Sequence, residues 1–268
     1  MRVRVAVVGV LCAVLVAGGA AGCGLDGESA ATGAPTTSRS PSDTPPAPSS
    51  GGATRSVPAV DPPMPAPTVT ATAADFSGSV SRIGPDLRAR MRFAHHRGCP
   101  VRLRDLRYVQ VSFVGFAGVA RSGELVVHES QARPVVRVFR TLYNERFPIR
   151  RMRLVDVYQG DDDASMSANN TSAYNCRRTT SGGRWSEHAY GRAIDINPIQ
   201  NPYLDGSFVA PHEGRRFAGI DRSLDAPYVR GALRSADVVV TAFERIGWLW
   251  GGDWTYSKDY QHFSATGR

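Results

Sequence analysis

The sequence predicts an α+β domain over residues 76–268, with an antiparallel sheet and flanking helices. Several short segments alternate apolar and polar side chains, as half-buried strands do. Two longer stretches instead repeat apolar residues at the spacing of one helical face. We find no internal repeat, and a segment of this length is long enough to bury a substantial core.

The first two helices are expected before residue 150. Pro85 and Asp86 favour a short helix over 84–94, because both residues suit the first helical turn. A second helix is expected over 134–147. Its apolar residues fall on a single face: Val135, Val138, Phe139 and Leu142.

The remaining elements follow from the same patterns. Strands are expected at 108–116, 125–128, 152–158, 193–197 and 260–264. Ser235 is predicted to cap a third helix that runs to Ile246 and stops at Gly247. Its inward face would consist of Val238, Val239, Ala242, Phe243 and Ile246. The polar stretch 161–187 is too long for a plain connection, which points to a functional segment.

The N-terminal 75 residues are not expected to be part of the fold. Residues 1–22 have the charged start, apolar run and small-residue end of an export signal. The ending before Cys23 resembles a bacterial lipobox, so Cys23 is a candidate for lipidation; an ordinary signal peptide with Cys23 incidental is the alternative. Residues 23–75 are rich in Pro, Ser, Thr and Ala and predict a disordered linker. The expected location is outside the cytoplasm, lipid-anchored to the outer face of the cytoplasmic membrane and reaching into the cell wall.

Charge and cysteine usage exclude several classes. The chain has 32 basic and 24 acidic residues, and all basic residues except Lys258 are Arg. Because an exported domain rarely meets nucleic acid, no nucleic-acid partner is expected; an anionic wall polymer or lipid, or a solvated surface without a partner, fits better. The four cysteines include no CxxC pair, which argues against a zinc ribbon. With Cys12 in the signal and Cys23 lipidated, Cys99 and Cys176 are predicted to form a disulfide; two buried thiols are the alternative.

Two imidazoles and a carboxylate form a candidate metal site. His188 and Asp195 lie close together in the sequence, and His262 follows on a later strand. Such a set binds zinc and leaves a fourth position open for water. Asp259 lies three residues before His262, where a strand would begin, and is the candidate general base. A nearby arginine could hold a substrate carboxylate or stabilise an oxyanion.

These residues resemble a known family. Ser-x-His-x-x-Gly-x-Ala-x-Asp over 186–195, with Asp-x-x-His-Phe over 259–263, is similar to the signature of the D-alanyl-D-alanine carboxypeptidase-like zinc peptidases. That family includes VanY-type carboxypeptidases and L-alanyl-D-glutamate endopeptidases. The resemblance covers about residues 150–268 and implies a hedgehog/DD-peptidase-like fold that acts on peptidoglycan stem peptides.

The resemblance also implies roles for individual residues. His188, Asp195 and His262 would bind one Zn2+ per chain, and Asp259 would be the base, where many members carry Glu. Arg177 is the candidate for the family's upstream arginine, with Arg178 as its competitor and a surface salt bridge as the alternative. Ser186 is either a partner of the ligands or a turn residue.

The expected activity is therefore that of a monomeric metallopeptidase of the cell wall, either a D,D-carboxypeptidase or an endopeptidase. A catalytically silent wall-binding lipoprotein that keeps the fold is the alternative from another class. A zinc amidase or esterase is the alternative within the hydrolases. The remaining histidines are expected to be structural, and the tryptophans at 248, 250 and 254 belong either to the core or to a cleft wall.

Overall fold

A computed structural model describes residues 75–179 and 182–268 of the chain. The predicted signal peptide, Cys23 and nearly all of the predicted linker lie outside the described residues. The predicted class is confirmed: the described part is an α+β domain whose sheets are almost all antiparallel, compatible with the peptidase-like fold that the motifs imply. No helix in this part is long and apolar enough to span a bilayer.

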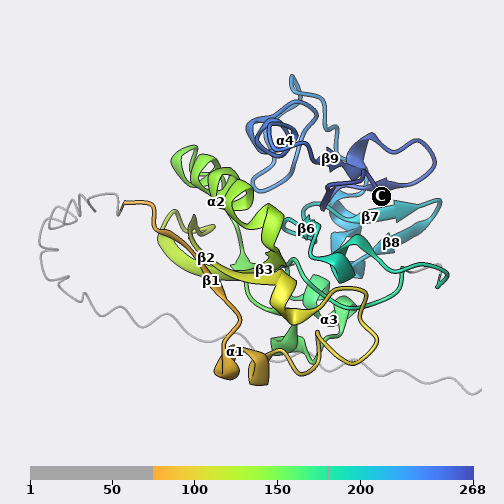
Figure 1. The fold of residues 1–268 in the computed structure, drawn as a ribbon. Helices are drawn as coiled ribbons and strands as arrows, with labels where there is room; N and C mark the ends of the chain where they lie inside the picture. The colour runs from red at the N-terminus through yellow and green to blue at the C-terminus, as the bar shows by residue number, and fades with distance from the viewer. Residues whose placement is uncertain (1–74, 180–181) are drawn as a thin grey trace, which may run out of the picture. The chain divides into compact units, whose positions relative to one another are not determined.

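One sheet and one long helix form the first half of the domain. The sheet consists of β1 (Gly78–Arg82), β2 (Leu106–Val114) and β3 (Ala120–His128), each antiparallel to the next. Helix α2 (Glu129–Asn144) lies along this sheet (Figure 1). Its buried face is the predicted one, Val135, Val138, Phe139 and Leu142, extended by Ala132.

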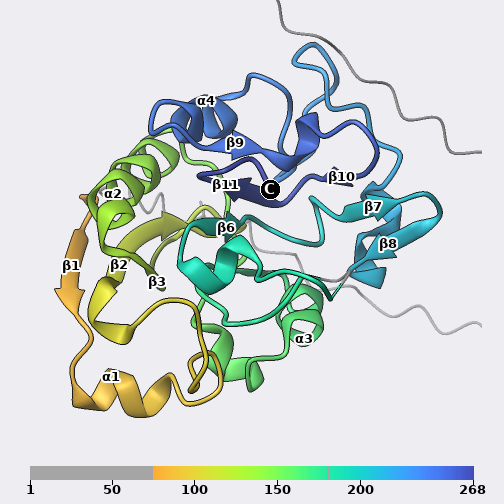
Figure 2. The same cartoon turned by 45° about the vertical axis from the view of Figure 1, so that its right-hand side comes forward.

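The second half adds small sheets beside the first. β6 (Ala193–Asp195), β11 (His262–Ser264) and β9 (Leu249–Trp250) form one; β10 (Lys258–Asp259), β7 (Tyr203–Asp205) and β8 (Phe208–Ala210) form another. β4 (Arg151–Met152) pairs with β5 (Asn170–Thr171) in parallel. Figure 2 shows β6 and β11 between the first sheet and the β7–β8 hairpin. The short helices are α1 (Pro85–Arg90), α3 (Asp162–Ser167) and α4 (Val238–Glu244).

The core joins the two halves. Phe139 and Leu142 of α2 belong to the same buried cluster as Phe243 of α4 and Phe263 of β11. The Phe243 and Phe263 rings stack with centroids 4.0 Å apart. Trp248 and Trp250 are buried here, so these two tryptophans are core residues. The strand that carries His262 is therefore anchored by its neighbour Phe263.

The predicted strand over 152–158 is wrong beyond Met152. Residues Val155–Tyr158 form a 3-10 helix. Leu154 and Val155 are both buried although adjacent, which strict strand alternation does not allow. Asp156 Oδ1 accepts hydrogen bonds from the backbone N–H groups of Phe93 and Ala94, at 2.8 and 2.9 Å. These long-range bonds hold the segment in a turn.

Two helix starts also differ from the prediction. Helix α2 begins at Glu129, five residues before the predicted start, so Pro134 lies inside the helix. The His128 side chain caps this earlier start by accepting a hydrogen bond from Ser130 N. Helix α4 is capped by Asp237 rather than Ser235; Asp237 Oδ1 accepts from Val239 N and Val240 N, both at 2.9 Å. The predicted inward face is corrected accordingly: Val238 is exposed and Val240 is buried.

The stretch 161–187 and the last predicted strand also differ from the prediction. The polar stretch contains α3 and β5. The predicted strand over 260–264 is shorter, and Asp259 belongs to β10, which pairs with β7 in a different sheet from His262. Asp259 and His262 thus approach the same region from two sheets.

Candidate active site

A tight turn places His188 and Asp195. The 3-10 helix η3 (Glu187–Tyr190) is capped by Ser186, whose Oγ accepts from His188 N at 3.3 Å. It ends at Gly191, which has a φ of 65°. A Cβ at Gly191 would lie 2.5 Å from His128 N, so this turn needs glycine for both its conformation and its close packing. β6 follows and carries Asp195.

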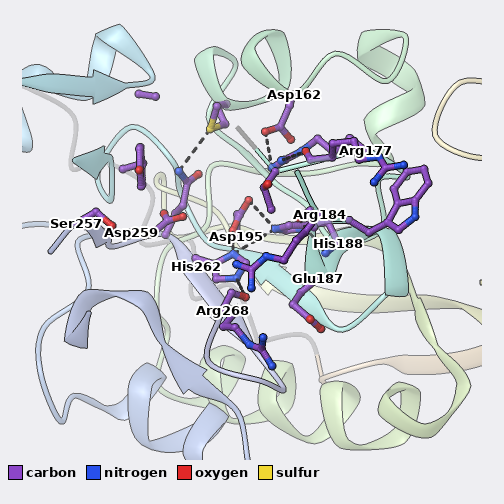
Figure 3. A pocket seen from close by; sticks show the side chains of 18 of the residues that line it. Asp162, Arg177, Arg184, Glu187, His188, Asp195, Ser257, Asp259, His262 and Arg268 are labelled. Atoms are coloured by element: carbon purple, nitrogen blue, oxygen red, sulfur yellow. Dashed lines mark hydrogen bonds and ion pairs between the residues drawn. The ribbon is translucent and has the colours of Figure 1, made fainter. Parts of the chain in front are cut away.

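Strand pairing then places His262. β11 is antiparallel to β6 in a register that sets His262 directly opposite Asp195. Directly opposite residues in an antiparallel pair have adjacent side chains on one face. Figure 3 shows His188, Asp195 and His262 pointing toward one another. All three side chains are buried.

The three potential ligand atoms form a small triangle. His188 Nε2 lies 3.3 Å from His262 Nδ1 and 3.1 Å from Asp195 Oδ2. His262 Nδ1 lies 3.0 Å from Asp195 Oδ1. Zinc–ligand distances of about 2.0–2.1 Å in a tetrahedron put neighbouring ligand atoms about 3.3 Å apart. The triangle therefore has nearly the size of one face of a zinc coordination shell.

Hydrogen bonds on the far side of each ring leave the facing nitrogens free to act as ligands. Nδ1 of His188 lies 2.5 Å from the carbonyl oxygen of Ala173, and Nε2 of His262 lies 3.0 Å from the main-chain oxygen of Arg268. An oxygen acceptor requires a proton on the nitrogen that it faces. When both rings are neutral, His188 Nε2 and His262 Nδ1 carry lone pairs that face each other beside a carboxylate, and this donor set fits a cation.

The electrostatics of the three groups agree with this arrangement. Burial alone would raise the pKa of Asp195, but the two adjacent imidazoles outweigh burial and hold this pKa well below its usual range. Burial would likewise lower the pKa of His262, but its hydrogen bond to Asp195 and the charge of that carboxylate raise this pKa to about 9. In the absence of a metal, a proton on His262 therefore compensates the buried carboxylate.

The comparison with known families matches this region. A family model described as D-alanyl-D-alanine carboxypeptidase matches residues 179–265, which include His188, Asp195, Asp259 and His262. The matched segment is therefore similar to this peptidase family. The family predicted from the motifs is thereby confirmed, and the match supports a peptidase. No curated protein and no solved structure matches the chain.

Within the matched segment, Asp259 lies beside the triangle without entering it. Gly251 makes room for Asp259, because a Cβ there would lie 2.9 Å from the Asp259 Cβ. Asp259 Oδ1 is fully enclosed and has no hydrogen-bond partner among the described residues. Burial is the main cause that raises the pKa of Asp259, to about 6. A carboxylate with a pKa near the working pH suits a general base.

Arg177 is held at the cleft by a residue that the sequence analysis did not identify. Its Nη2 lies 2.7 Å from Asp162 Oδ2 at the start of α3, and Figure 3 shows this ion pair. Arg178 instead lies over the Trp185 ring, 4.2 Å from its centroid. Both arginines line the cleft, but only Arg177 is tied to it by a carboxylate.

The cleft around the triangle has a volume of about 860 Å³. It is lined by every proposed catalytic and metal-binding residue, including Ser186 and Arg177. Trp254 also lines it, with its ring centroid 5.7 Å from that of His262. Sequence reasoning missed several other lining residues, among them Asp162, Arg184, Arg192 and Arg268, because none of them occupies a fixed position of the two motifs.

The predicted disulfide is present. Cys99 and Cys176 are bonded, with their Cα atoms 5.8 Å apart, although they lie 77 positions apart in the sequence. Cys176 directly precedes Arg177, so the bond fixes the backbone next to the cleft arginine.

Two histidines outside the triangle have structural contacts, as expected from the sequence. His95 Nδ1 forms a hydrogen bond with Tyr174 OH, and His128 caps α2.

Proposed function

We propose that this protein is a zinc-dependent hydrolase of amide bonds in peptidoglycan stem peptides. The single observation that carries the proposal is the buried triangle of His188 Nε2, Asp195 and His262 Nδ1, with Asp259 beside it in one cleft. The family match over the same segment supports peptidase chemistry. Bound Zn2+ would supply Lewis acidity, which polarises the scissile carbonyl and lowers the pKa of water.

Three side chains of the protein have further roles in this reaction. Asp259 is the base that accepts a proton from water and returns it to the leaving amine, since burial sets its pKa near 6. Arg177 provides a guanidinium, oriented by Asp162, for the oxyanion or for a substrate carboxylate. Ser186 acts through the backbone: it caps the turn that presents His188.

The composition of the cleft supports an anionic peptide as substrate. Arg184, Arg192 and Arg268 line it and form no ion pair with a carboxylate in the part of the chain that the structure describes. Stem peptides carry several carboxylates, and guanidinium groups bind carboxylates with bidentate geometry. We propose a lipid anchor at Cys23 and a location at the cell wall as the setting for this activity.

The test is digestion of a panel of purified stem peptides, with products identified by mass spectrometry. Cleavage by the zinc-loaded chain, lost in Asp259→Ala, supports the proposal, and the product masses identify a carboxypeptidase or an endopeptidase. Peptide binding without cleavage by a zinc-loaded wild-type chain would instead support a silent wall-binding protein.

A further inference from the structure

The two histidines of the triangle, His188 and His262, are oriented by different parts of the chain. His188 bonds to Ala173, whose backbone lies inside the domain and is buried. The far nitrogen of His262 instead bonds to the main-chain oxygen of Arg268, six residues later. The orientation of one ligand therefore depends on the short segment 265–268 that follows β11.

This segment is folded back by specific contacts. Ala265 N donates to Arg192 O at 3.0 Å, which continues the pairing of β11 with β6. Arg268 N donates to the Oγ of the fully buried Ser264, also at 3.0 Å. Gly267 has a φ of 72°, and a Cβ there would lie 2.7 Å from Leu249 Cδ1. Ser264 and Gly267 together set the turn that returns the Arg268 oxygen to His262.

The position of the Arg268 oxygen matters because it determines which nitrogen of the His262 ring carries the proton. His262 can present Nδ1 as a ligand only if its ring proton is on Nε2. The Arg268 oxygen is the acceptor that Nε2 faces, at 3.0 Å, so it selects this tautomer and fixes the rotation of the ring. Acceptors behind metal-binding histidines typically contribute 10–100-fold to metal affinity.

We infer that the main-chain oxygen of Arg268 is a positioning group for the metal ligand His262, and that the turn 264–268 is part of the metal site. The inference rests on the proposed function only for the presence of a metal. It assigns the role to the backbone of Arg268, while its guanidinium, which lines the cleft, is free for substrate.

The experiment compares three variants with wild type. Deletion of Gly267 and Arg268 removes the oxygen, and Ser264→Ala removes the anchor of the turn. Arg268→Ala is the matched control, because it removes the side chain and keeps the main-chain oxygen. Zinc affinity is measured by competition with a chelator, and the d–d absorption spectrum of the Co2+-loaded protein reports the ligand geometry.

We expect the deletion to weaken zinc binding by about 10–100-fold and to alter the Co2+ spectrum. Ser264→Ala should cause a smaller loss in the same direction, and Arg268→Ala should bind zinc within about twofold of wild type. Circular dichroism of the metal-free proteins verifies folding, and Ser264→Ala decides the matter if the deletion variant does not fold. Wild-type affinity in every folded variant, or an equal loss in Arg268→Ala, would overturn the inference. A wild-type chain that binds zinc but cleaves no peptide would contradict the proposed function alone.

Discussion

His188 Nε2 and His262 Nδ1 lie 3.3 Å apart, although the two residues are 74 positions apart in the sequence. The antiparallel register of β6 and β11 causes this proximity, because it sets His262 opposite Asp195, and the turn at Gly191 brings His188 back to the same point. Two ring nitrogens without protons at this distance repel each other unless a cation lies between them. The metal-free site therefore needs a proton, and binding of a metal ion would release it.

Zinc binding should follow directly from this geometry. We expect about one zinc per chain in wild type and none in His262→Ala, measured by elemental analysis of the purified protein. Zinc at about 100 times its Kd should stabilise the wild-type fold by about 2.7 kcal/mol, because it binds only the folded site. His212→Ala is the control, since His212 lies at the surface and outside the cleft. A similar zinc content in both alanine variants would rule out this site.

The affinity for zinc should depend on pH in a defined direction. The pKa of His262 in the metal-free protein is about 9, so zinc must displace one proton below that pH. Affinity should therefore rise about tenfold per pH unit from pH 7 toward 9 and level off above it. Calorimetric titrations in buffers of different ionisation enthalpy count the released protons. A flat profile between pH 7 and 9 would show that His262 is already neutral.

The site residues could be proposed from the sequence because their spacing is local. His188 and Asp195 belong to one turn-and-strand unit, and Asp259 and His262 lie within four residues of each other. Asp162 and the Arg268 oxygen could not be predicted in this way. Asp162 contacts Arg177 from a different element, α3. The Arg268 oxygen belongs to the main chain, which every residue has, so no residue type in the sequence indicates its role.

The fold class and the main helix could also be predicted from the sequence, whereas details set by long-range contacts could not. The face of α2 follows from its apolar spacing, and the class follows from the alternating segments. The predicted strand 152–158 was wrong because Asp156 bonds to the backbone near α1, a contact between residues more than 60 positions apart. The cap of α4 was misplaced by two residues because Ser235 and Asp237 both suit that position and only packing decides between them.

Asp259→Asn should abolish hydrolysis while stabilising the metal-free protein. The pKa of Asp259 is raised to about 6, chiefly by burial, so its charged form is unfavourable in the fold. Since the folded pKa exceeds the unfolded one, the stability associated with the protonated acid is lost as pH rises from about 4 through 6. At pH 7–8 the neutral amide should therefore gain about 1–3 kcal/mol, measured by urea unfolding.

The same variant tests the pH profile of the reaction. In wild type, kcat/KM should fall as pH drops through about 6 or somewhat lower, because bound zinc favours the charged carboxylate. At pH 4, where Asp259 is protonated, the stability difference between wild type and Asp259→Asn should disappear. A stability gain that persists unchanged at pH 4 would contradict this account.

Asp162→Asn should slow the reaction without affecting metal binding. Asp162 holds the Arg177 guanidinium at 2.7 Å, and hydrogen bonds between charged groups contribute about 1.5–3 kcal/mol. If that orientation serves the transition state, kcat/KM should fall by about 10–100-fold while zinc affinity stays at the wild-type value. Asp163→Asn is the matched control: Asp163 lines the same cleft from the next position of α3 and is exposed. Equal losses in both variants would indicate a general effect of charge.

Replacing Cys99 and Cys176 together by serine should lower stability and activity to different extents. The disulfide links residues 77 positions apart, and a native cross-link of this kind typically contributes about 2–4 kcal/mol. It also fixes the backbone beside Arg177, while the metal triangle lies on η3, β6 and β11. We therefore expect a lower unfolding midpoint in urea, a reduced kcat/KM at temperatures where the variant is folded, and unchanged zinc affinity. A variant with weakened zinc binding and normal turnover per bound zinc would show that the disulfide supports the metal site rather than Arg177.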